Sequence, residues 1–180
     1  MKKIAAEGKD GFYKGRIADA IINAVKAHGG LLTHQDLASH ASEMVEPISF
    51  DYHDWTIWEM PPNSQGVTAL MALGIIRALE EEHGLDFTKV KHNSADYLHV
   101  IIEAMRLAFA DTRYYVNDPQ VDLPIAARKL LSKKYLSERA KLINLKKRNN
   151  MITKGYPDRT SDTVYFSVVD KDGNACSFMV

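Results

Sequence analysis

The stretch "RTSDTVYFSVVDKDGNACSFMV", residues 159–180, decides the fold class that we expect. Its runs "TVYFSVVD" and "ACSFMV" are rich in β-branched and aromatic residues, which favour strands. Asp172-Gly173 between them is a tight-turn signal, so the pattern predicts a β-hairpin. Because a lone two-stranded hairpin is marginal in water, we expect it to belong to a sheet whose other strands are mostly outside this sequence.

The residues before this hairpin read differently. Residues 146–162 are rich in Lys, Arg, Asn and turn-forming residues and have almost no apolar periodicity. Such a composition predicts a mobile, solvated linker.

Most of the remaining chain predicts helices, and one stretch predicts a second hairpin. Residues 45–60 carry two β-prone runs separated by a turn-like stretch at 51–54, with Pro47 at a strand start or sheet edge. Thr33, with Asp36 three residues later, is an expected helix N-cap. Two further helices are expected to begin at a cap, the first at Asn63 or Ser64 and the second at Asn93 or Ser94. Gly84 is an expected helix end. The predicted helices are 11–28, 35–41, 67–83, 93–116, 125–131 and 134–145.

Composition narrows the function classes. Of the 180 residues, 46% are apolar and 26% are charged, which is typical of a globular protein. Lys plus Arg and Asp plus Glu number 23 each, so no basic excess points to nucleic acid or a membrane surface. The sequence has no apolar run of transmembrane length and no signal-peptide pattern, which favours the cytoplasm unless the true start lies elsewhere.

Several side chains are candidates for chemistry, each with a structural alternative. His99 and Glu103 share a helical face and could be metal ligands or a hydrogen-bonded pair. We expect the hydrogen-bonded pair, and we predict no metal or cofactor. The cluster Asp111, Arg113 and Asp118 suggests a salt-bridge network or an anion site. Cys176, the single cysteine, is expected to be a buried thiol rather than a nucleophile. The run Lys146-Lys147-Arg148 is expected to be solvated rather than a binding patch.

Ser161, Asp162 and Thr163 stand where the polar linker meets the strand. Cutting the peptide bond before Thr163 would give that residue a free α-amine beside its own hydroxyl. An α-amine titrates near pKa 8 and can act as the general base for the hydroxyl. This arrangement is what a self-cleaving Thr nucleophile needs.

Four motifs, in order, give the chain a family resemblance. They are "GGLLTHQDLASH" (29–40), "VEPISFDYHDWTIWEMPPNSQGVTALMAL" (45–73), "YLHVIIEAMRLAFADTRYYVNDP" (97–119) and "DTVYFSVVDKDGNACS" (162–177). In these motifs the chain resembles the γ-glutamyltranspeptidases, the glutathione hydrolases of the N-terminal-nucleophile hydrolase superfamily.

The resemblance implies an α+β fold that is an incomplete share of a four-layer αββα sandwich. It implies that residues 1–145 are the C-terminal helical part of a large subunit, 146–162 a processing linker, and 163–180 the start of a small subunit. It also implies cleavage between Asp162 and Thr163, with Thr163 then attacking a γ-glutamyl amide such as glutathione.

Two departures from the family pattern qualify this resemblance. Thr163-Val164-Tyr165 stands where many members have Thr-Thr-His, which leaves an amidase acting on a cephalosporin or on poly-γ-glutamate as an alternative. The family's substrate-binding Arg, remaining substrate ligands and oxyanion glycines have no counterpart in the 180 residues, so we expect a fragment that is inactive alone. The alternative from another class is a non-catalytic interaction module.

Overall fold

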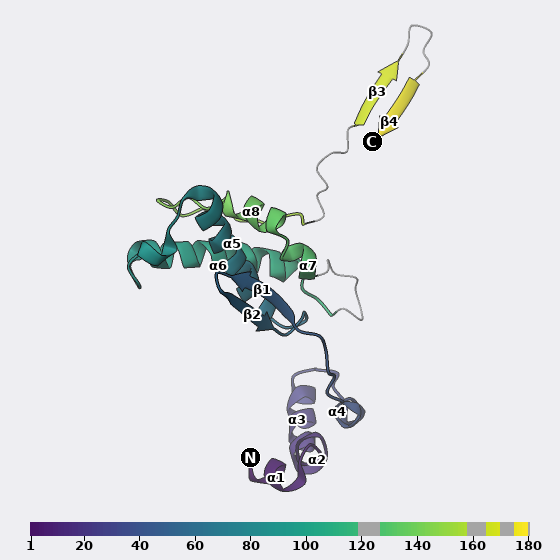
Figure 1. The fold of residues 1–180 in the computed structure, drawn as a ribbon. Coiled ribbons are helices and arrows are strands. Elements are labelled where there is room, and N and C mark those ends of the chain that lie inside the picture. The colour runs from purple at the N-terminus through teal and green to yellow at the C-terminus, as the bar shows by residue number, and fades with distance from the viewer. Residues whose placement is uncertain (119–126, 158–164, 170–174, 180) are drawn as a thin grey trace. The chain divides into compact units, whose positions relative to one another are not determined.

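A computed structural model describes residues 1–118, 127–157, 165–169 and 175–179, the last two ranges as backbone strands. The chain divides into two compact units, Met1–Met44 and Val45–Val180. The described elements are helices and two antiparallel hairpins, an α+β composition (Figure 1). No described helix is long and apolar enough to cross a membrane.

The first unit consists of short helices. These are α1 (Lys2–Glu7), α2 (Asp10–Tyr13), α3 (Gly15–Ala27) and α4 (His34–Ser39). The predicted single helix over 11–28 is wrong at its start, because Lys14 is extended and Gly15 has a φ of 63°, a conformation that glycine adopts freely. The Thr33 cap is confirmed: its hydroxyl accepts from the Asp36 N–H, and the Asp36 carboxylate accepts from the Thr33 N–H.

The second unit is built around α5 (Gly66–His83). Ten of its residues are buried, because α5 contacts α6 (Ala95–Tyr115), α8 (Lys133–Ala140) and the hairpin of β1 (Ile48–Tyr52) and β2 (Trp55–Glu59) (Figure 1). Gly84 ends α5 in the left-handed conformation, as predicted, with a φ of 67°. The α5 N-cap is Gln65, whereas Ser64 accepts a long 3.4 Å bond from the Gly66 N–H.

The helices around α5 match the predicted pattern in part. Ser94 caps α6 by accepting from the Tyr97 N–H at 3.2 Å, as predicted. A 3₁₀ turn, η1 (Phe87–Lys89), and a short helix, α7 (Ala127–Leu130), complete the helical part. The predicted end of the last helix at residue 145 is wrong, because α8 ends at Ala140 and Ile143 turns into the core.

The predicted C-terminal hairpin is confirmed as a pair of strands. β3 (Tyr165–Val169) pairs with β4 (Ala175–Met179) antiparallel, with Val168 opposite Cys176. Its expected place in a larger sheet stays a prediction.

Candidate active site

Ser161, Asp162 and Thr163, the predicted cleavage site, lie outside the described residues. The structure does describe the chain that leads to them as far as Pro157. Residues 144–157, here called the anchored segment, run over α6 and α8 and are held there by hydrogen bonds. The sequence predicts a mobile, solvated linker over residues 146–162. In residues 146–157 the backbone is held by these bonds, while many of the side chains are exposed.

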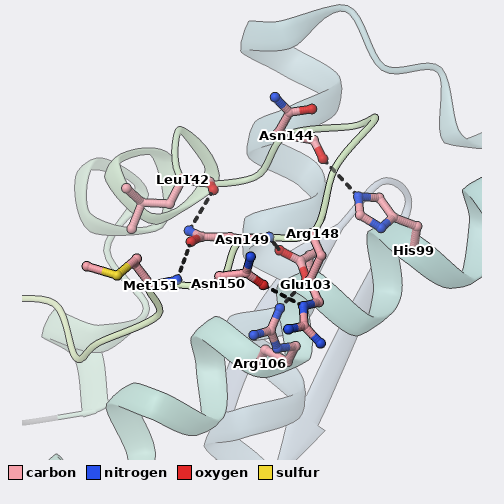
Figure 2. Close-up of polar contacts among 9 residues, drawn as sticks. All are labelled: His99, Glu103, Arg106, Leu142, Asn144, Arg148, Asn149, Asn150 and Met151. Carbon is pink, nitrogen blue, oxygen red and sulfur yellow. Dashed lines mark hydrogen bonds and ion pairs between the residues drawn. The ribbon is translucent and has the colours of Figure 1, made fainter.

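The first anchor of this segment is Glu103 on α6 (Figure 2). Its side chain is 1% exposed, and its carboxylate accepts from the Asn149 backbone N–H at 2.9 Å and pairs with Arg106. One turn earlier on α6, His99 bonds through Nε2 to the Asn144 carbonyl at 2.8 Å. Because a carbonyl only accepts, Nε2 carries the proton. The predicted hydrogen bond between His99 and Glu103 is therefore replaced by bonds from each side chain to a different backbone group of the anchored segment.

The Asn149 side chain shapes the turn that the first anchor holds (Figure 2). Its amide Nδ2 donates to the Leu142 carbonyl at 3.1 Å, and its Oδ1 accepts from the Met151 N–H at 2.8 Å. A side chain that bonds backbone groups on both sides of its own position fixes the local path of the chain.

The second anchor is Asp111, which is 0% exposed. Its Oδ1 accepts from the Gly155 N–H at 2.6 Å, and its Oδ2 lies 3.0 Å from Nε of Arg139 on α8. The Nε and Oδ2 atoms meet as an ion pair without the angle of a hydrogen bond. Arg139 also donates to the Thr153 carbonyl at 2.8 Å, so a single buried pair holds two points of the anchored segment.

Burial and bonding act in opposite directions on Asp111. Burial raises the pKa of its carboxyl, while the Gly155 N–H and the Arg139 guanidinium oppose that rise by stabilising the charged form. A buried carboxylate needs such partners, because an unpaired buried charge is strongly destabilising.

Gly155 is held on both of its backbone groups. Its N–H donates to Asp111, and its carbonyl accepts from the Tyr115 hydroxyl at 2.6 Å. A Cβ at this position would lie 2.3 Å from Oη of Tyr135, whose side chain is buried. The close approach of the backbone to this ring therefore requires glycine. We call Asp111, Tyr115, Tyr135 and Arg139 the Gly155 clamp.

Lys154 adds an aromatic contact beside the clamp. Its Nζ lies 3.1 Å from the ring centroid of Tyr114, 5.4 Å from that of Tyr115 and 5.2 Å from that of Tyr156. A cation over aromatic faces is attracted to them, by about 0.5–1 kcal/mol where the site is exposed. The segment is thus held through its backbone and through a side chain.

The other predicted candidates separate in space. Asp111 does form an ion pair, but with Arg139 and not with Arg113, while Arg113 lines a cavity of about 280 Å³ beside the start of α5. Asp118 lies beyond the end of α6 at Tyr115, and its N–H donates to the Asn117 side chain. Within the described residues, no three His, Cys, Asp or Glu side chains form a group that fits a metal ion.

Neither the basic run at residues 146–148 nor the single cysteine belongs to the anchors described above. Lys146, Lys147 and Arg148 are exposed, and Arg148 bonds the Asn150 side chain. Cys176 stands in β4, and its side chain is outside the described part of the structure. The sequence patterns did not indicate a role for Arg139, Tyr115 or Gly155. The one available signal was Gly155 itself, a glycine within the predicted linker.

Residues 1–180 match the family model for gamma-glutamyltranspeptidase. The chain is 35% identical over 180 residues to the glutathione hydrolase-like YwrD proenzyme of Bacillus subtilis, covering 99% of this chain and 32% of that protein. Among solved structures it is similar to a cephalosporin acylase from Bacillus halodurans, with a TM-score of 0.67 and 39% identity over 98% of this chain and 30% of the acylase.

The chain is also similar to the solved structure of a gamma-glutamyltranspeptidase from Pseudomonas nitroreducens complexed with L-DON. The TM-score is again 0.67, with 31% identity over 85% of this chain and 45% of that one. Measured against the curated Bacillus subtilis proenzyme, the chain spans about a third of the relative's length.

Proposed function

The chain belongs to the gamma-glutamyltranspeptidase family, and we propose that it forms part of an enzyme that hydrolyses or transfers the γ-glutamyl group of glutathione-like amides. In this proposal residues 1–162 end the large subunit and Thr163 begins the small subunit. The complete protein has the αββα sandwich of the N-terminal-nucleophile hydrolases.

The first step is self-cleavage between Asp162 and Thr163. The Thr163 hydroxyl adds to the Asp162 carbonyl carbon, the peptide C–N bond breaks, and the hydroxyl proton ends on the released α-amine. Water then hydrolyses the ester that joins the two residues. The products are an Asp162 carboxylate and a Thr163 with a free amine and hydroxyl.

In turnover the free α-amine of Thr163 is the general base. It accepts the hydroxyl proton as Oγ1 attacks the γ-glutamyl carbonyl, and it returns that proton to the departing amine. The resulting ester is then resolved by water, which gives hydrolysis, or by the amine of an amino acid, which gives transfer.

The observation that carries the proposal is the position of Asp162-Thr163 in the chain. The bond follows a segment whose backbone is held as far as Gly155, and it precedes β3, which begins at Tyr165. The described structure ends at Pro157 before the bond and resumes at Tyr165 after it. A held approach to the bond supports self-cleavage, because intramolecular reactions depend on a defined approach of the reacting atoms. The family match extends over residues 1–180 and so includes this bond.

Oxyanion donors and the group that binds the substrate carboxylate would come from the rest of the two subunits. Each missing oxyanion donor costs about 10²–10³ in rate. We therefore expect the purified 180-residue chain to release no p-nitroaniline from γ-glutamyl-p-nitroanilide. Clear turnover by this chain would show that the site is complete within it.

A second candidate function is an acylase that removes the side chain of a cephalosporin. The similarity to the Bacillus halodurans acylase, at 39% identity, favours it, as does Val164-Tyr165 in place of the common Thr-His.

The test is substrate profiling of the full-length protein. It is incubated with γ-glutamyl-p-nitroanilide, glutathione and a cephalosporin with a dicarboxylic side chain, beside a Thr163→Ala variant. Turnover of the γ-glutamyl amides that is lost in the variant supports the proposal, whereas turnover of the cephalosporin alone supports the acylase. Identical behaviour of the two proteins on every substrate would favour a non-catalytic module.

A further inference from the structure

The two anchors of the anchored segment stand at different distances from the predicted cleavage site. Gly155 precedes Thr163 by eight residues in sequence, and Asn149 precedes it by fourteen. We propose that the Gly155 clamp is a positioning device for self-cleavage, which sets the register in which the chain reaches the Asp162-Thr163 bond. This inference rests on the proposed function.

The clamp fixes orientation as well as place. The Gly155 N–H and carbonyl bond to Asp111 and Tyr115, two residues of α6, at 2.6 Å each. Two bonds to successive peptide groups determine how the chain leaves this point, because each peptide unit is planar. The Arg139 bond to the Thr153 carbonyl fixes the chain two residues earlier.

The chemistry of the clamp favours a role in register over a role in stability. Asp111 is 0% exposed and Arg139 is 4% exposed, so both charges have lost most of their hydration. The attraction within a buried ion pair often does no more than offset that loss, and specifying one register is the best-attested use of such groups. Here both members of the pair bond backbone groups of the same short segment.

Self-cleavage is the step that needs such register. The Thr163 hydroxyl and the Asp162 carbonyl must approach within near-attack distance, and a misplacement of about 1 Å can cost about 10²-fold in rate. Turnover after cleavage makes no such demand on the segment, because the new end at Asp162 is no longer joined to Thr163.

The Glu103 anchor supplies a matched control within the same segment. Glu103 is as buried as Asp111 and also accepts a backbone N–H, that of Asn149. Six residues separate Asn149 from Gly155 in sequence, so the clamp stands between this anchor and the cleavage site. Loss of the Glu103 contact should lower stability without changing the register at Asp162.

The experiment follows self-cleavage of the full-length protein over time by gel and mass spectrometry, with the thermal midpoint of each variant measured in parallel. The clamp variants are Gly155→Ala, whose Cβ would meet the Tyr135 ring, and Tyr115→Phe, which removes one bond to the Gly155 carbonyl. The control variant is Glu103→Ala, which removes the acceptor of the Asn149 N–H.

We expect Gly155→Ala to slow cleavage by about 10- to 100-fold and Tyr115→Phe to slow it less. Glu103→Ala should cleave at the unchanged rate despite a lower thermal midpoint. Adding Tyr135→Phe to Gly155→Ala removes the closest contact, at 2.3 Å, and should restore part of the rate. A purely structural clamp would not show this rescue together with the separation of rate from stability.

Two results would overturn the proposal, and they differ from failure of the function itself. Cleavage of Gly155→Ala at the unchanged rate would remove the clamp's role while leaving self-cleavage intact. Equal slowing in Gly155→Ala and Glu103→Ala, in proportion to lost stability, would reduce the clamp to a structural contact. Absence of cleavage in the unchanged protein would overturn the proposed self-cleavage and the clamp's role together.

Discussion

At the scale of single residues, buried charged side chains reveal most about how the candidate site is built. Asp111 and Arg113 looked like partners in the sequence, but residues two apart on a helix point to different faces. Asp111 turns inward and meets Arg139 from α8, while Arg113 stays exposed beside a cavity. A helical pattern reveals which face is apolar, but it does not reveal that a returning segment will cover a charged residue such as Arg139.

Replacing Asp111 with Asn tests how much this buried pair contributes. The change leaves the 4%-exposed Arg139 without an opposite charge, so we expect the free energy of unfolding to fall by about 3–5 kcal/mol. Urea denaturation of the full-length protein measures it. Glu81→Gln, which breaks a solvent-screened pair with Arg77, is the control and should cost at most about 1 kcal/mol. Equal losses in the two variants would contradict the burial argument.

The pH dependence of stability tests the Asp111 environment separately. Because burial raises its pKa above the ordinary 3.8, the folded chain binds this proton more tightly than the unfolded chain does. Its contribution to the free energy of unfolding therefore falls as pH rises from 3.8 through the raised pKa. Urea denaturation at several pH values should show that Asp111→Asn removes this slope.

Asp86 provides a control of opposite sign. Bonds from Lys89 and Thr88 lower its pKa to about 2, so its contribution is present above pH 3.8 and is lost as pH falls toward about 2. Asp86→Asn should therefore flatten the acid limb of the stability curve. The same pH profile for both variants would contradict the assignment.

At the scale of elements, local signals predicted the strongest features and missed those made by tertiary contacts. Helix ends at Thr33, Ser94 and Gly84 were predictable from residue type alone. The two hydroxyls cap helix starts, and the glycine takes the left-handed conformation that ends α5. The end of α8 at Ala140 was not predictable in this way. It depends on burial of Ile143 and on the bond from His99 to the Asn144 carbonyl, a residue 45 positions away.

The packing of elements around α5 depends on Gly74. A Cβ there would lie 2.4 Å from Cδ1 of Leu136 on α8 and 3.0 Å from Cζ of Phe50 on β1. Glycine thus lets a helix and a strand both approach α5 closely. We expect Gly74→Ala to destabilise the unit by about 1–3 kcal/mol, despite the better helix propensity of alanine.

Thermal and urea denaturation of the full-length protein measure the Gly74→Ala effect. Ala69→Gly, on the exposed side of α5, is the matched control and should cost only the propensity difference of about 1 kcal/mol. Stabilisation by Gly74→Ala would show that the neighbouring elements move apart without cost.

At the scale of the whole molecule, the activity proposed from the family match depends on cleavage of the Asp162-Thr163 bond. The chain spans about a third of the length of the curated relative that it matches, and the predicted cleavage site falls near its C-terminal hairpin. The motif order predicted the family, which the comparisons confirm over residues 1–180. The held backbone of residues 146–157 was not predictable, because its partners come from α6 and α8.

The intact-mass spectrum of the purified full-length protein tests this claim most directly. We expect two chains, with the smaller beginning at Thr163, and a single uncleaved chain for Thr163→Ala. A full-length protein that stays in one piece, or one that is cut at another bond, would contradict it.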